Sequence, residues 1–562
     1  MRHPTRTRFH RPWFAALTAL LAGQVAWAQG ENVAAAAPAA PALKLDTGDT
    51  AWILTCTALV LMMTIPGLFL FYGGLVRTKN VLSTFMHSVF CAALVSVAWV
   101  AVGYSVAFGD GGEGNAWWGG LSQAGLSGVL GSAHPLAPTI PAILFVAYQC
   151  TFAIITPALI SGAFAERMRF AGFALFALLW SLLIYAPLCH WVWGGGWIGS
   201  KIGALDFAGG TVVHISSGIS ALVAAVFVGK RTGYPHDPMP PHNLAFTVLG
   251  AGLLWVGWFG FNAGSALGSN ELAGLALVNT NTAAAAAALS WLLVERLRSG
   301  KATLLGAASG AVAGLVVITP AAGFVSPLSA LAMGLLGGVV CYFGVALKPR
   351  FGYDDSLDVV GVHLVGGITG ALLTGVFADK AVNPAVTALS LGCEGGIIAG
   401  DWSLLGKQAL AVGVTLIFCG GGSWLLLALV NLITPVRATR EEELVGLDLS
   451  QHSERAYAFG GGESFAAQSI AEPRAAAAPP ITGERFGVVL EGVDPAAMID
   501  RWRNLCQEGR ATSAEFRDLY AQLTTVRGTR FRFRGNNKEQ VRQSLARLFA
   551  DLGQNVTARL EA

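Results

Sequence analysis

Charged residues are scarce in this chain. Asp, Glu, Lys and Arg make up only 12% of its 562 residues, whereas 54% of the residues are hydrophobic. About one quarter of a typical soluble protein is charged, so a deficit of this size over this length excludes an ordinary soluble enzyme. The composition is instead typical of a protein that crosses a membrane many times. The formal net charge of +3 is too small to indicate a nucleic-acid partner.

Sequence motifs for metals, disulfides and catalysis are also missing. The eight cysteines are scattered along the chain, and none stands in a CxxC or zinc-ligand spacing. The sequence contains no Walker motif and no nucleophile–base set. It therefore predicts no enzymatic activity, no metal and no cofactor.

Eleven long apolar segments account for most of the chain. They cover approximately residues 50–75, 80–108, 140–164, 170–190, 208–229, 244–268, 272–294, 302–322, 326–347, 357–378 and 404–434. We expect each to cross a membrane as a helix. Together they predict an all-α polytopic membrane domain over residues 48–436, with 11 transmembrane helices.

The N-terminus has the features of a secretory signal peptide over residues 1–28. A basic stretch over residues 2–11 is followed by a short apolar stretch and by the sequence AWA at residues 26–28, which is typical of a cleavage site. Cleavage would leave a leader over residues 29–47 on the periplasmic side. An uncleaved membrane anchor is the alternative.

Basic residues predict the orientation of the segments, because Lys and Arg concentrate in cytoplasmic loops. With the N-terminus outside and an odd number of spans, the loops expected to lie inside hold Arg77, Lys79, Arg167, Arg169, Lys230, Arg231, Arg296, Arg298, Lys301, Lys348, Arg350, Arg437 and Arg440. The loops and helix ends expected outside hold Lys201, Lys380 and Lys407. We therefore expect a bacterial-type inner membrane protein whose C-terminus is cytoplasmic.

The fifth and tenth apolar segments resemble each other around a histidine. Residues 213–219 read VHISSGI and residues 362–368 read VHLVGGI, so a Val precedes each His, and Gly and Ile follow at the same offsets. Because the two segments are five helices apart, they cross the membrane in opposite directions. The pattern predicts a 5+5 inverted repeat plus one further helix, in which the transported species passes between the repeats.

His214 and His363 are the ionisable groups of this repeat. A lone buried histidine is usually a hydrogen-bonded structural residue, but an ionisable group at membrane depth is costly and usually functional. Two at equivalent depth favour a functional pair that is neutral or shares one proton, because burial and mutual repulsion disfavour two charges. Asp206, just before the fifth segment, is interpreted as a helix cap in preference to a cation ligand.

Aromatic residues supply a candidate cation site. Phe152 and Phe261 lie in apolar segments, and Trp193 lies near the outer end of the fourth segment. An interfacial belt also explains such a tryptophan, but an aromatic face attracts a cation by about 0.5–2 kcal/mol. Ser265 would add a hydroxyl acceptor.

These segments resemble the signatures of the ammonium transporter (Amt/Mep/Rh) family. The matching stretches are residues 64–67 (TIPG), 71–80 (FYGGLVRTKN), 206–214 (DFAGGTVVH), 257–265 (GWFGFNAGS) and 358–363 (DVVGVH). The resemblance covers roughly residues 46–457, and stretches of this length are highly specific. The loop from Trp193 to Asp206 looks about one residue longer than is usual in the family.

The resemblance implies a homotrimer with one pore per subunit, which recruits ammonium and conducts ammonia, with or without a separately relayed proton. Carried over by position, the implied residues are Trp193, Phe152, Ser265 and Asp206 for the outer ammonium site, Phe152 and Phe261 for a gate, and His214 and His363 for the pore. Trp193 with Ser265 indicates the Amt branch, since the Rh branch typically lacks that pair, and disfavours a carbon dioxide channel. Residues 437–459 look like the family's cytoplasmic regulatory tail, which implies a PII-type protein as a partner.

The C-terminal residues lie outside the usual extent of the family. Residues 460–480 are rich in Gly, Ala, Ser and Pro and indicate a linker. Residues 481–562 predict a small cytosolic α/β domain of ferredoxin-like type, with one helix from Asp494 to Cys506 and another whose apolar stripe runs from Val541 to Leu552 and which is closed by Gly553. Basic residues dominate positions 527–547, which indicates either a solvated face or a surface for anionic lipid or a phosphate group. This domain motivates the alternative function, an ammonium sensor that signals through its C-terminus.

Overall fold

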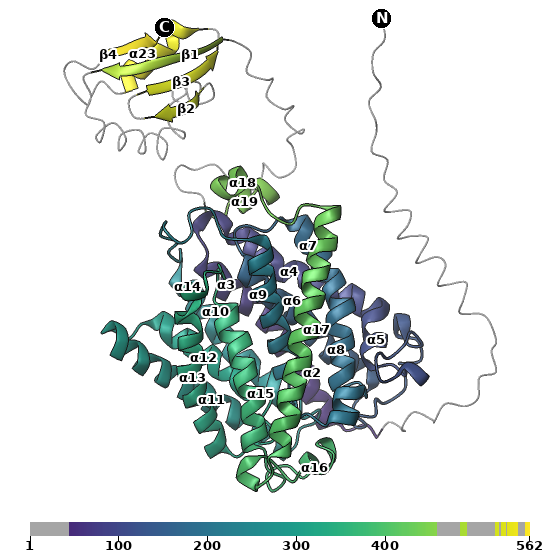
Figure 1. The fold of residues 1–562 in the computed structure, drawn as a ribbon. Helices are drawn as coiled ribbons and strands as arrows, with labels where there is room; N and C mark the ends of the chain where they lie inside the picture. The colour runs from purple at the N-terminus through teal and green to yellow at the C-terminus, as the bar shows by residue number, and fades with distance from the viewer. Residues whose placement is uncertain are drawn as a thin grey trace, which may run out of the picture. The chain divides into compact units, whose positions relative to one another are not determined.

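The structure is a computed structural model that describes residues 44–457, 484–491, 523–527, 530–535, 537–548 and 557–561. The chain divides into one unit that ends at Ala458 and a second from Phe459 to Ala562, and each is described by itself (Figure 1). The expected signal peptide, nearly all of the leader, the linker and the helix from Asp494 to Cys506 lie outside the described residues.

The described part of the first unit is built from helices, ten of which are long and apolar enough to cross a membrane. The ten spans are α2–α3 (Thr47–Leu75), η2–α5 (Thr78–Phe108), α6 (Ala142–Phe164), α7–α8 (Phe170–Val192), η8–α9 (Gly210–Val228), α10–η9 (Leu244–Ala263), α11 (Glu271–Ser299), α13 (Pro327–Ala346), η10–α15 (Val360–Phe377) and α17 (Ser403–Ile433). The expectation of a helical polytopic fold is confirmed.

The eighth expected segment is shorter than the others. It forms α12 (Leu304–Ile318), which has 15 residues and therefore rises only about 22 Å. Most of its residues from Gly306 onward are buried, because α12 packs against α10, α11 and α13. The count of eleven membrane crossings stays a prediction.

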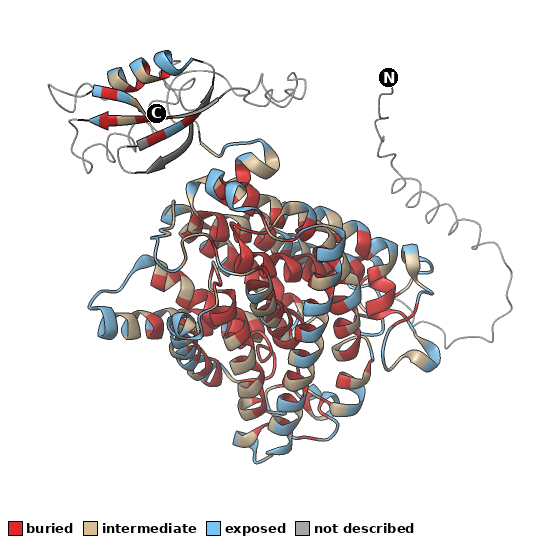
Figure 2. Ribbon diagram, turned by 45° about the horizontal axis from the view of Figure 1, so that its top comes forward, coloured by how far each residue is buried: buried red, intermediate tan, exposed pale blue. Residues whose placement is uncertain are grey.

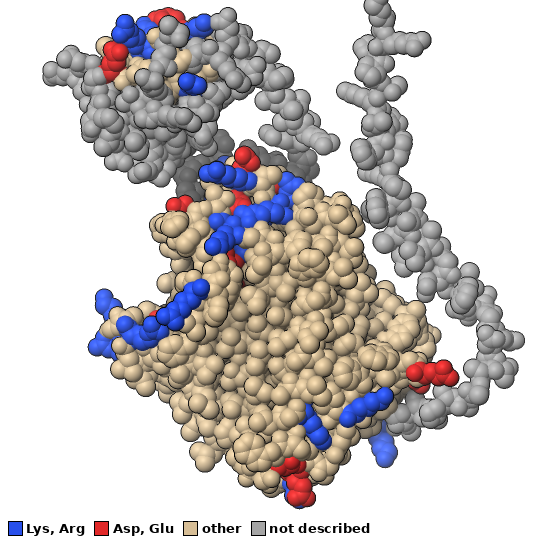
Figure 3. All heavy atoms as spheres, in the orientation of Figure 1, with Lys and Arg blue, Asp and Glu red and all other residues tan. Residues whose placement is uncertain are grey.

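The sides of the first unit are apolar. Large hydrophobic residues such as Val97, Ile417 and Leu432 are 71%, 79% and 83% exposed, whereas the buried residues lie in the interior of the bundle (Figure 2). On the face drawn in Figure 3, charged atoms lie at the top, at the left edge and near the bottom of the unit, and a wide uncharged surface lies between them. This is the surface expected of helices that face lipid.

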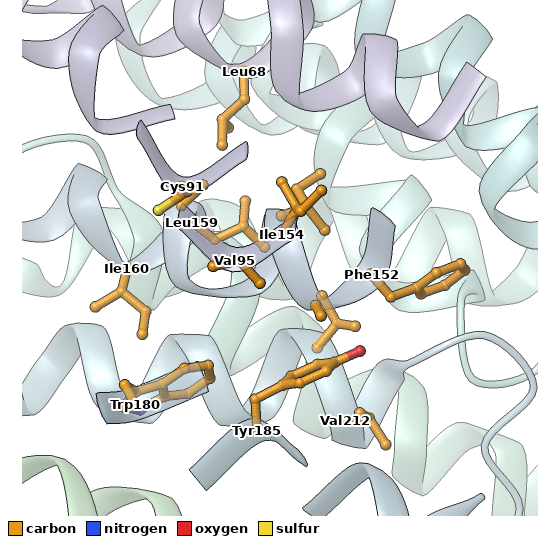
Figure 4. Close-up of a cluster of buried hydrophobic side chains, with 14 of the residues drawn as sticks. Leu68, Cys91, Val95, Phe152, Ile154, Leu159, Ile160, Trp180, Tyr185 and Val212 are labelled. Atoms are coloured by element: carbon orange, nitrogen blue, oxygen red, sulfur yellow. The ribbon is translucent and has the colours of Figure 1, made fainter. Parts of the chain in front are cut away.

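Helix α6 occupies the middle of the first unit and packs against α2, α4 (Val81–Ala98) and α9. Its side chains form one hydrophobic cluster with those of neighbouring helices, and the cluster includes Leu68, Cys91, Val95, Phe152, Ile154, Leu159, Ile160, Trp180, Tyr185 and Val212 (Figure 4). The indole N–H of Trp180 donates to the hydroxyls of Ser220 and Ser423, at 3.1 and 3.0 Å. This packing holds Phe152 at the centre of the bundle.

The described part of the second unit is a four-stranded sheet with one helix. The strands β1 (Glu484–Glu491), β2 (Leu523–Arg527), β3 (Arg530–Gly535) and β4 (Thr557–Glu561) lie in the order β2-β3-β1-β4, and every neighbouring pair is antiparallel. Helix α23 (Lys538–Leu548) packs against β4 and β1, and Val488, Phe531, Phe533 and Leu545 are buried. The strand order is that of a split βαβ arrangement, as in ferredoxin-like sheets. Leu552 and Gly553, where the sequence analysis ends this helix, lie outside the described residues.

Candidate transport pathway

The two repeat histidines lie side by side inside the first unit. His214 stands in the π-helical turn η8 (Gly210–Ile215), which leads into α9 (Ser216–Val228). His363 stands in the π-helical turn η10 (Val360–Leu364), which leads into α15 (Val365–Phe377). Their Nδ1 atoms are 3.2 Å apart, and the residues are 1% and 4% exposed. The backbone therefore repeats along with the sequence, since each histidine precedes a 13-residue α-helix.

The contact between the two Nδ1 atoms limits how the pair can be protonated. A hydrogen bond between ring nitrogens needs one donor and one acceptor, so only one of the two Nδ1 atoms carries a proton. Nε2 of His214 has no hydrogen-bond partner among the described residues. That nitrogen can therefore exchange a hydrogen bond or a proton with a molecule in the pathway.

Two glycines bring the histidine segments into close contact. A Cβ atom at Gly218 would lie 2.6 Å from Cα of Leu364, and a Cβ atom at Gly367 would lie 3.1 Å from Cβ of His214. Gly218 is four residues after His214, and Gly367 is four residues after His363. Each glycine thus packs against the residues around the opposite histidine, as a two-fold relation between the repeats requires.

Asp206 caps the turn that carries His214. Its two carboxylate oxygens accept hydrogen bonds from the backbone amides of Gly209, Gly210, Thr211 and Val212, at 2.8–3.1 Å. The side chain is therefore fully used in fixing the first turn of η8, and the capping interpretation agrees with this geometry. The indole N–H of Trp193 donates to the Asp206 carbonyl at 2.8 Å. This hydrogen bond joins the two ends of the loop between these residues.

The structure reveals a counterpart of Asp206 in the second repeat. Asp355 stands eight residues before His363, as Asp206 stands eight residues before His214, and its carboxylate accepts from the amide of Val360 at 2.7 Å. Burial raises the pKa of the Asp355 carboxyl. The equal spacing of eight residues between the aspartate and the histidine in each repeat is the sequence signal that could have identified Asp355.

Phenylalanine side chains stack above the histidines. The ring centroids of Phe152 and Phe261 are 4.3 Å apart at an interplanar angle of 32°, and both residues are buried. The ring centroids of Trp193 and Phe152 are 6.1 Å apart at an interplanar angle of 89°. Those of Phe261 and His214 are also 6.1 Å apart, at 28°. The predicted gate residues therefore separate Trp193 from the histidine pair.

A cavity of about 590 Å³ lies beside Trp193, on the side of the phenylalanine pair away from His363. Its lining includes all four residues predicted for the outer site, which are Trp193, Phe152, Ser265 and Asp206. A smaller cavity on the other side of the pair is lined by His214, His363 and apolar residues such as Leu68 and Val312. Among the described residues no group of three His, Cys, Asp or Glu side chains could hold a metal ion.

Tyr148 and Trp258 position the pathway residues, and the sequence analysis missed both. The Tyr148 hydroxyl lies 2.9 Å from the Phe261 carbonyl and 3.4 Å from the Ser265 hydroxyl, and Trp258 stacks on the ring of His214 at 5.5 Å and 24°. Tyr148 lies one helical turn before Phe152 in α6, and this spacing could have indicated its place.

Comparison with known proteins identifies the family. The model of the Ammonium Transporter Family matches residues 51–457. The chain belongs to this family. Its members are transporters and not enzymes, in agreement with the missing catalytic motifs. The second unit, from Phe459 onward, lies outside the match.

Individual relatives support the assignment over the same part of this family member. An ammonium transporter of Bacillus subtilis is 52% identical over 414 residues, which cover 74% of this chain and 99% of the relative. An ammonium transporter of Mycobacterium bovis is 46% identical over 469 residues, or 79% and 97% of the two chains. The crystal structure of Saccharomyces cerevisiae Mep2 superimposes with a TM-score of 0.66 at 37% identity and covers 71% of this chain and 89% of that one. A structure titled "Sensor Amt Protein" gives 0.65 at 29% identity, with coverage of 72% and 98%.

A charged network lies at the end of the first unit opposite the cavity beside Trp193. Glu166 forms ion pairs with Arg77 and Arg231, at 2.9 and 3.0 Å, and Arg231 also pairs with Asp354 at 2.8 Å. Burial raises the pKa of the Glu166 carboxyl, but Arg231 and Arg77 outweigh it, so that the net pKa lies below its ordinary value.

The tail after the last span of this ammonium transporter packs on the same end. Its two short helices are α18 (Arg440–Val445) and α19 (Leu447–His452). The ammonium group of Lys79 donates to the carbonyl of Leu444 at 2.7 Å, and Asp448 accepts from the amide of Ser83 at 2.8 Å. The tail is therefore attached to the start of the second span.

Proposed function

We propose that this ammonium transporter collects NH4⁺ beside Trp193 and passes ammonia between His214 and His363. One observation carries the proposal: the aromatic rings form a continuous series. Successive ring centroids from Trp193 to Phe152, Phe261, His214 and His363 are separated by 6.1, 4.3, 6.1 and 5.3 Å. A recruitment site, a gate and a proton-accepting pair thus follow one another along one line.

The outer cavity has the chemistry to distinguish ammonium from potassium. Ammonium carries four N–H donors, whereas potassium is held by several oxygens. Trp193 offers an aromatic face, because its own N–H is occupied by the Asp206 carbonyl, and such a face attracts a cation. The Ser265 hydroxyl, which donates to the Phe261 carbonyl at 2.9 Å, keeps lone pairs for an N–H donor.

The narrow section favours ammonia over a hydrated cation. Below the gate, apolar side chains and two imidazoles line the smaller cavity, and a desolvated charge there would be costly. A substrate that leaves its proton behind avoids this cost. Nε2 of His214 is a group that can take that proton, so the pair can either relay it or return it.

The remaining features of the proposal concern the arrangement in the cell. We place the chain in a bacterial-type inner membrane, with the large cavity outside and the tail in the cytoplasm, on the distribution of basic residues. The functional assembly is a homotrimer with one pathway per subunit, and a PII-type protein binds its cytoplasmic face. These features rest on the family resemblance.

An ammonium sensor is the second candidate, because the "Sensor Amt Protein" structure is similar over 72% of this chain and a further unit follows the family match. Uptake of labelled methylammonium distinguishes the two functions. The full chain is compared with a chain that ends at Ala458, at equal levels in the membrane. We expect uptake by both chains. Absence of uptake from both would favour the sensor.

A further inference from the structure

His190 is a buried histidine whose two ring nitrogens both face backbone carbonyls. It lies in the last turn of α8 (Ala186–Val192) and is 0% exposed. Its Nδ1 atom is 2.9 Å from the carbonyl oxygen of Ala107, and its Nε2 atom is 2.6 Å from that of Asn115. A carbonyl oxygen accepts hydrogen bonds and cannot donate them, so each of these contacts needs an N–H group on the ring.

This geometry fits a charged ring and not a neutral one. A neutral imidazole carries one N–H group, whereas the imidazolium carries two. Turning the ring over does not remove the requirement, because a C–H group approaches a carbonyl oxygen only to about 3.3–3.6 Å. Both contacts of His190 are shorter than that.

The surroundings of His190 favour a positive charge. The last carbonyls of a helix have no intrahelical partners and carry partial negative charge. His190 lies at the end of α8, and Ala107 is the penultimate residue of α5 (Tyr104–Phe108), which ends the second span. Two helix C-termini therefore meet at this ring, and they offset part of the cost of burying its charge.

The hydrogen bonds of the His190 ring go to backbone atoms and not to charged side chains. The elements packed against α8 are α5, η6 (Ser181–Tyr185), η7 (Ile198–Ile202) and η8. The titratable groups of these elements and of the adjoining segments are Tyr104, Asp110, Glu113, Tyr185, Cys189, Lys201, Asp206 and His214. All of them belong to the described residues, and none forms a hydrogen bond or an ion pair with the His190 ring. Its contacts with the two carbonyls therefore depend on its own protonation.

We propose that the proton on His190 holds the loop over residues 109–117 closed, and that His190 is thereby a positioning residue for Trp193. Other hydrogen bonds attach the same loop beside α8. The indole N–H of Trp191 donates to the Trp117 carbonyl at 2.7 Å, and the amide of Trp197 donates to the Ala116 carbonyl at 3.2 Å. Loss of the proton leaves one of the two carbonyls at His190 without a donor, which weakens this attachment.

The 109–117 loop borders the site proposed for ammonium. A second cavity, of about 610 Å³, is lined by Asn115 of the loop and by Trp193, which also lines the cavity described above. The turn that carries Trp193 is fixed at His190 as well, because the His190 carbonyl accepts from the amides of Gly194 and Gly196 at 3.0 and 2.9 Å. Opening of the loop therefore changes the surroundings of Trp193. The effect on ammonium binding rests on the proposed function, whereas the protonation of His190 does not.

His134, which precedes the third span, is a natural control. Its Nδ1 atom accepts a hydrogen bond from the amide of Leu136 at 3.2 Å, so that nitrogen carries no proton. Its ring stacks on that of Phe145 with centroids 4.1 Å apart, and burial lowers the pKa of His134 to about 4. Near neutral pH this histidine is therefore neutral, and its substitution leaves the protonation of His190 untouched.

Hydrogen exchange of the full chain in nanodiscs tests the proposal. The quantity measured is the protection of the 109–117 loop, corrected for the intrinsic exchange rate, from about pH 5 to pH 8, the range in which histidine ordinarily changes its charge. The proton stabilises the closed loop at low pH, and this stabilisation is lost as the pH rises, by at most about tenfold per pH unit for one proton. We expect protection in the wild type to fall roughly tenfold over the whole range, because one buried carbonyl loses its donor.

Two glutamine variants assign the effect to one residue. His190→Gln donates from a single nitrogen and does not titrate, so protection of its 109–117 loop should be low and independent of pH. His134→Gln, the matched control, should keep the wild-type dependence on pH. Equal protection of the wild-type loop at all pH values would overturn the proposal, and this result is decisive even if His190→Gln fails to fold. A pH dependence that persists unchanged in His190→Gln would overturn it as well.

Methylammonium uptake separates this proposal from the proposed function. The half-saturation concentrations of His190→Gln and the wild type should differ at about pH 5, where the variant has the higher value, and converge at about pH 8. Equal values at both pH values would show that His190 does not position Trp193. Trp193→Leu should keep the wild-type pH profile of the loop. If that variant also saturates like the wild type, the proposed ammonium site is wrong while the proton on His190 stands.

Discussion

Replacing Asp206 tests whether its carboxylate holds the η8 turn or binds the substrate. In Asp206→Ala, the amides of Gly209, Gly210, Thr211 and Val212 lose their acceptor. Each buried amide left without a partner costs about 1–3 kcal/mol. The carboxylate borders the cavity beside Trp193, so water can replace part of the lost hydrogen bonding. We therefore expect the free energy of unfolding to fall by an amount near the lower limit for four amides, about 4 kcal/mol.

Two further variants sharpen this prediction. Asp206→Asn keeps one acceptor oxygen, so it should retain about half of the four hydrogen bonds and lose roughly half as much stability. Asp355→Ala removes the counterpart of Asp206 in the second repeat, whose carboxylate accepts a hydrogen bond from the amide of Val360. This substitution should lower the free energy of unfolding by only about 1–3 kcal/mol.

The assay combines thermal unfolding of the purified variants with their half-saturation concentration for methylammonium. If the cap is the main role, stability falls in the order wild type, Asp206→Asn, Asp206→Ala, and the asparagine variant still transports. The reasoning is refuted if Asp206→Ala unfolds like the wild type while both substitutions raise the half-saturation concentration equally. In that case the negative charge itself binds the cation.

Four other substitutions address the proposed pathway and the charged network at the other end of the first unit. Trp193→Leu should raise the half-saturation concentration by the equivalent of about 0.5–2 kcal/mol; unchanged saturation in a properly inserted protein would contradict the cation site. His214→Asp should still pass ammonium but leak potassium, because an ionised carboxylate favours intact cations, and His363→Ala should strongly reduce ammonium current; full selectivity in the first and full current in the second would make the pair structural. The pKa of Glu166 is lowered, so the stability it contributes is present above the unfolded carboxyl pKa of about 4.3 and is lost as the pH falls through the lower folded value. Arg231→Gln should therefore move the acid unfolding transition to higher pH, which circular dichroism during acid titration would measure.

Much of the first unit could be predicted because its constraints are local in sequence. A membrane span needs a long apolar segment, and ten of the eleven expected segments have that length as helices. The eighth differs because α12 is surrounded by other helices, and a buried helix need not match the thickness of the bilayer. Apolarity in sequence does not distinguish a helix that faces lipid from one that faces protein.

The repeat located the histidines but not the residues that orient them. The VH…GI pattern identified His214 and His363, whose rings lie in contact. Tyr148 and Trp258 contact the residues of the proposed pathway from α6 and α10, and the only short-range clue to Tyr148 is its spacing of one helical turn before Phe152. Hydrogen bonds such as that from Tyr148 to the Phe261 carbonyl join residues 113 positions apart. The π-helical turns likewise depend on the packing around them and left no signal in the sequence.

The glycines at Gly218 and Gly367 define the separation of the two halves of the pathway. Because each one meets the residues around the opposite histidine, an added methyl group at Gly218 would push α9 away from η10, and one at Gly367 would push α15 away from η8. The distance between the two histidine segments therefore depends on two residues that have no side chain. If the proposed pathway runs between the histidines, substitutions meant to admit larger amines should begin at these two glycines, and His214 and His363 can be kept.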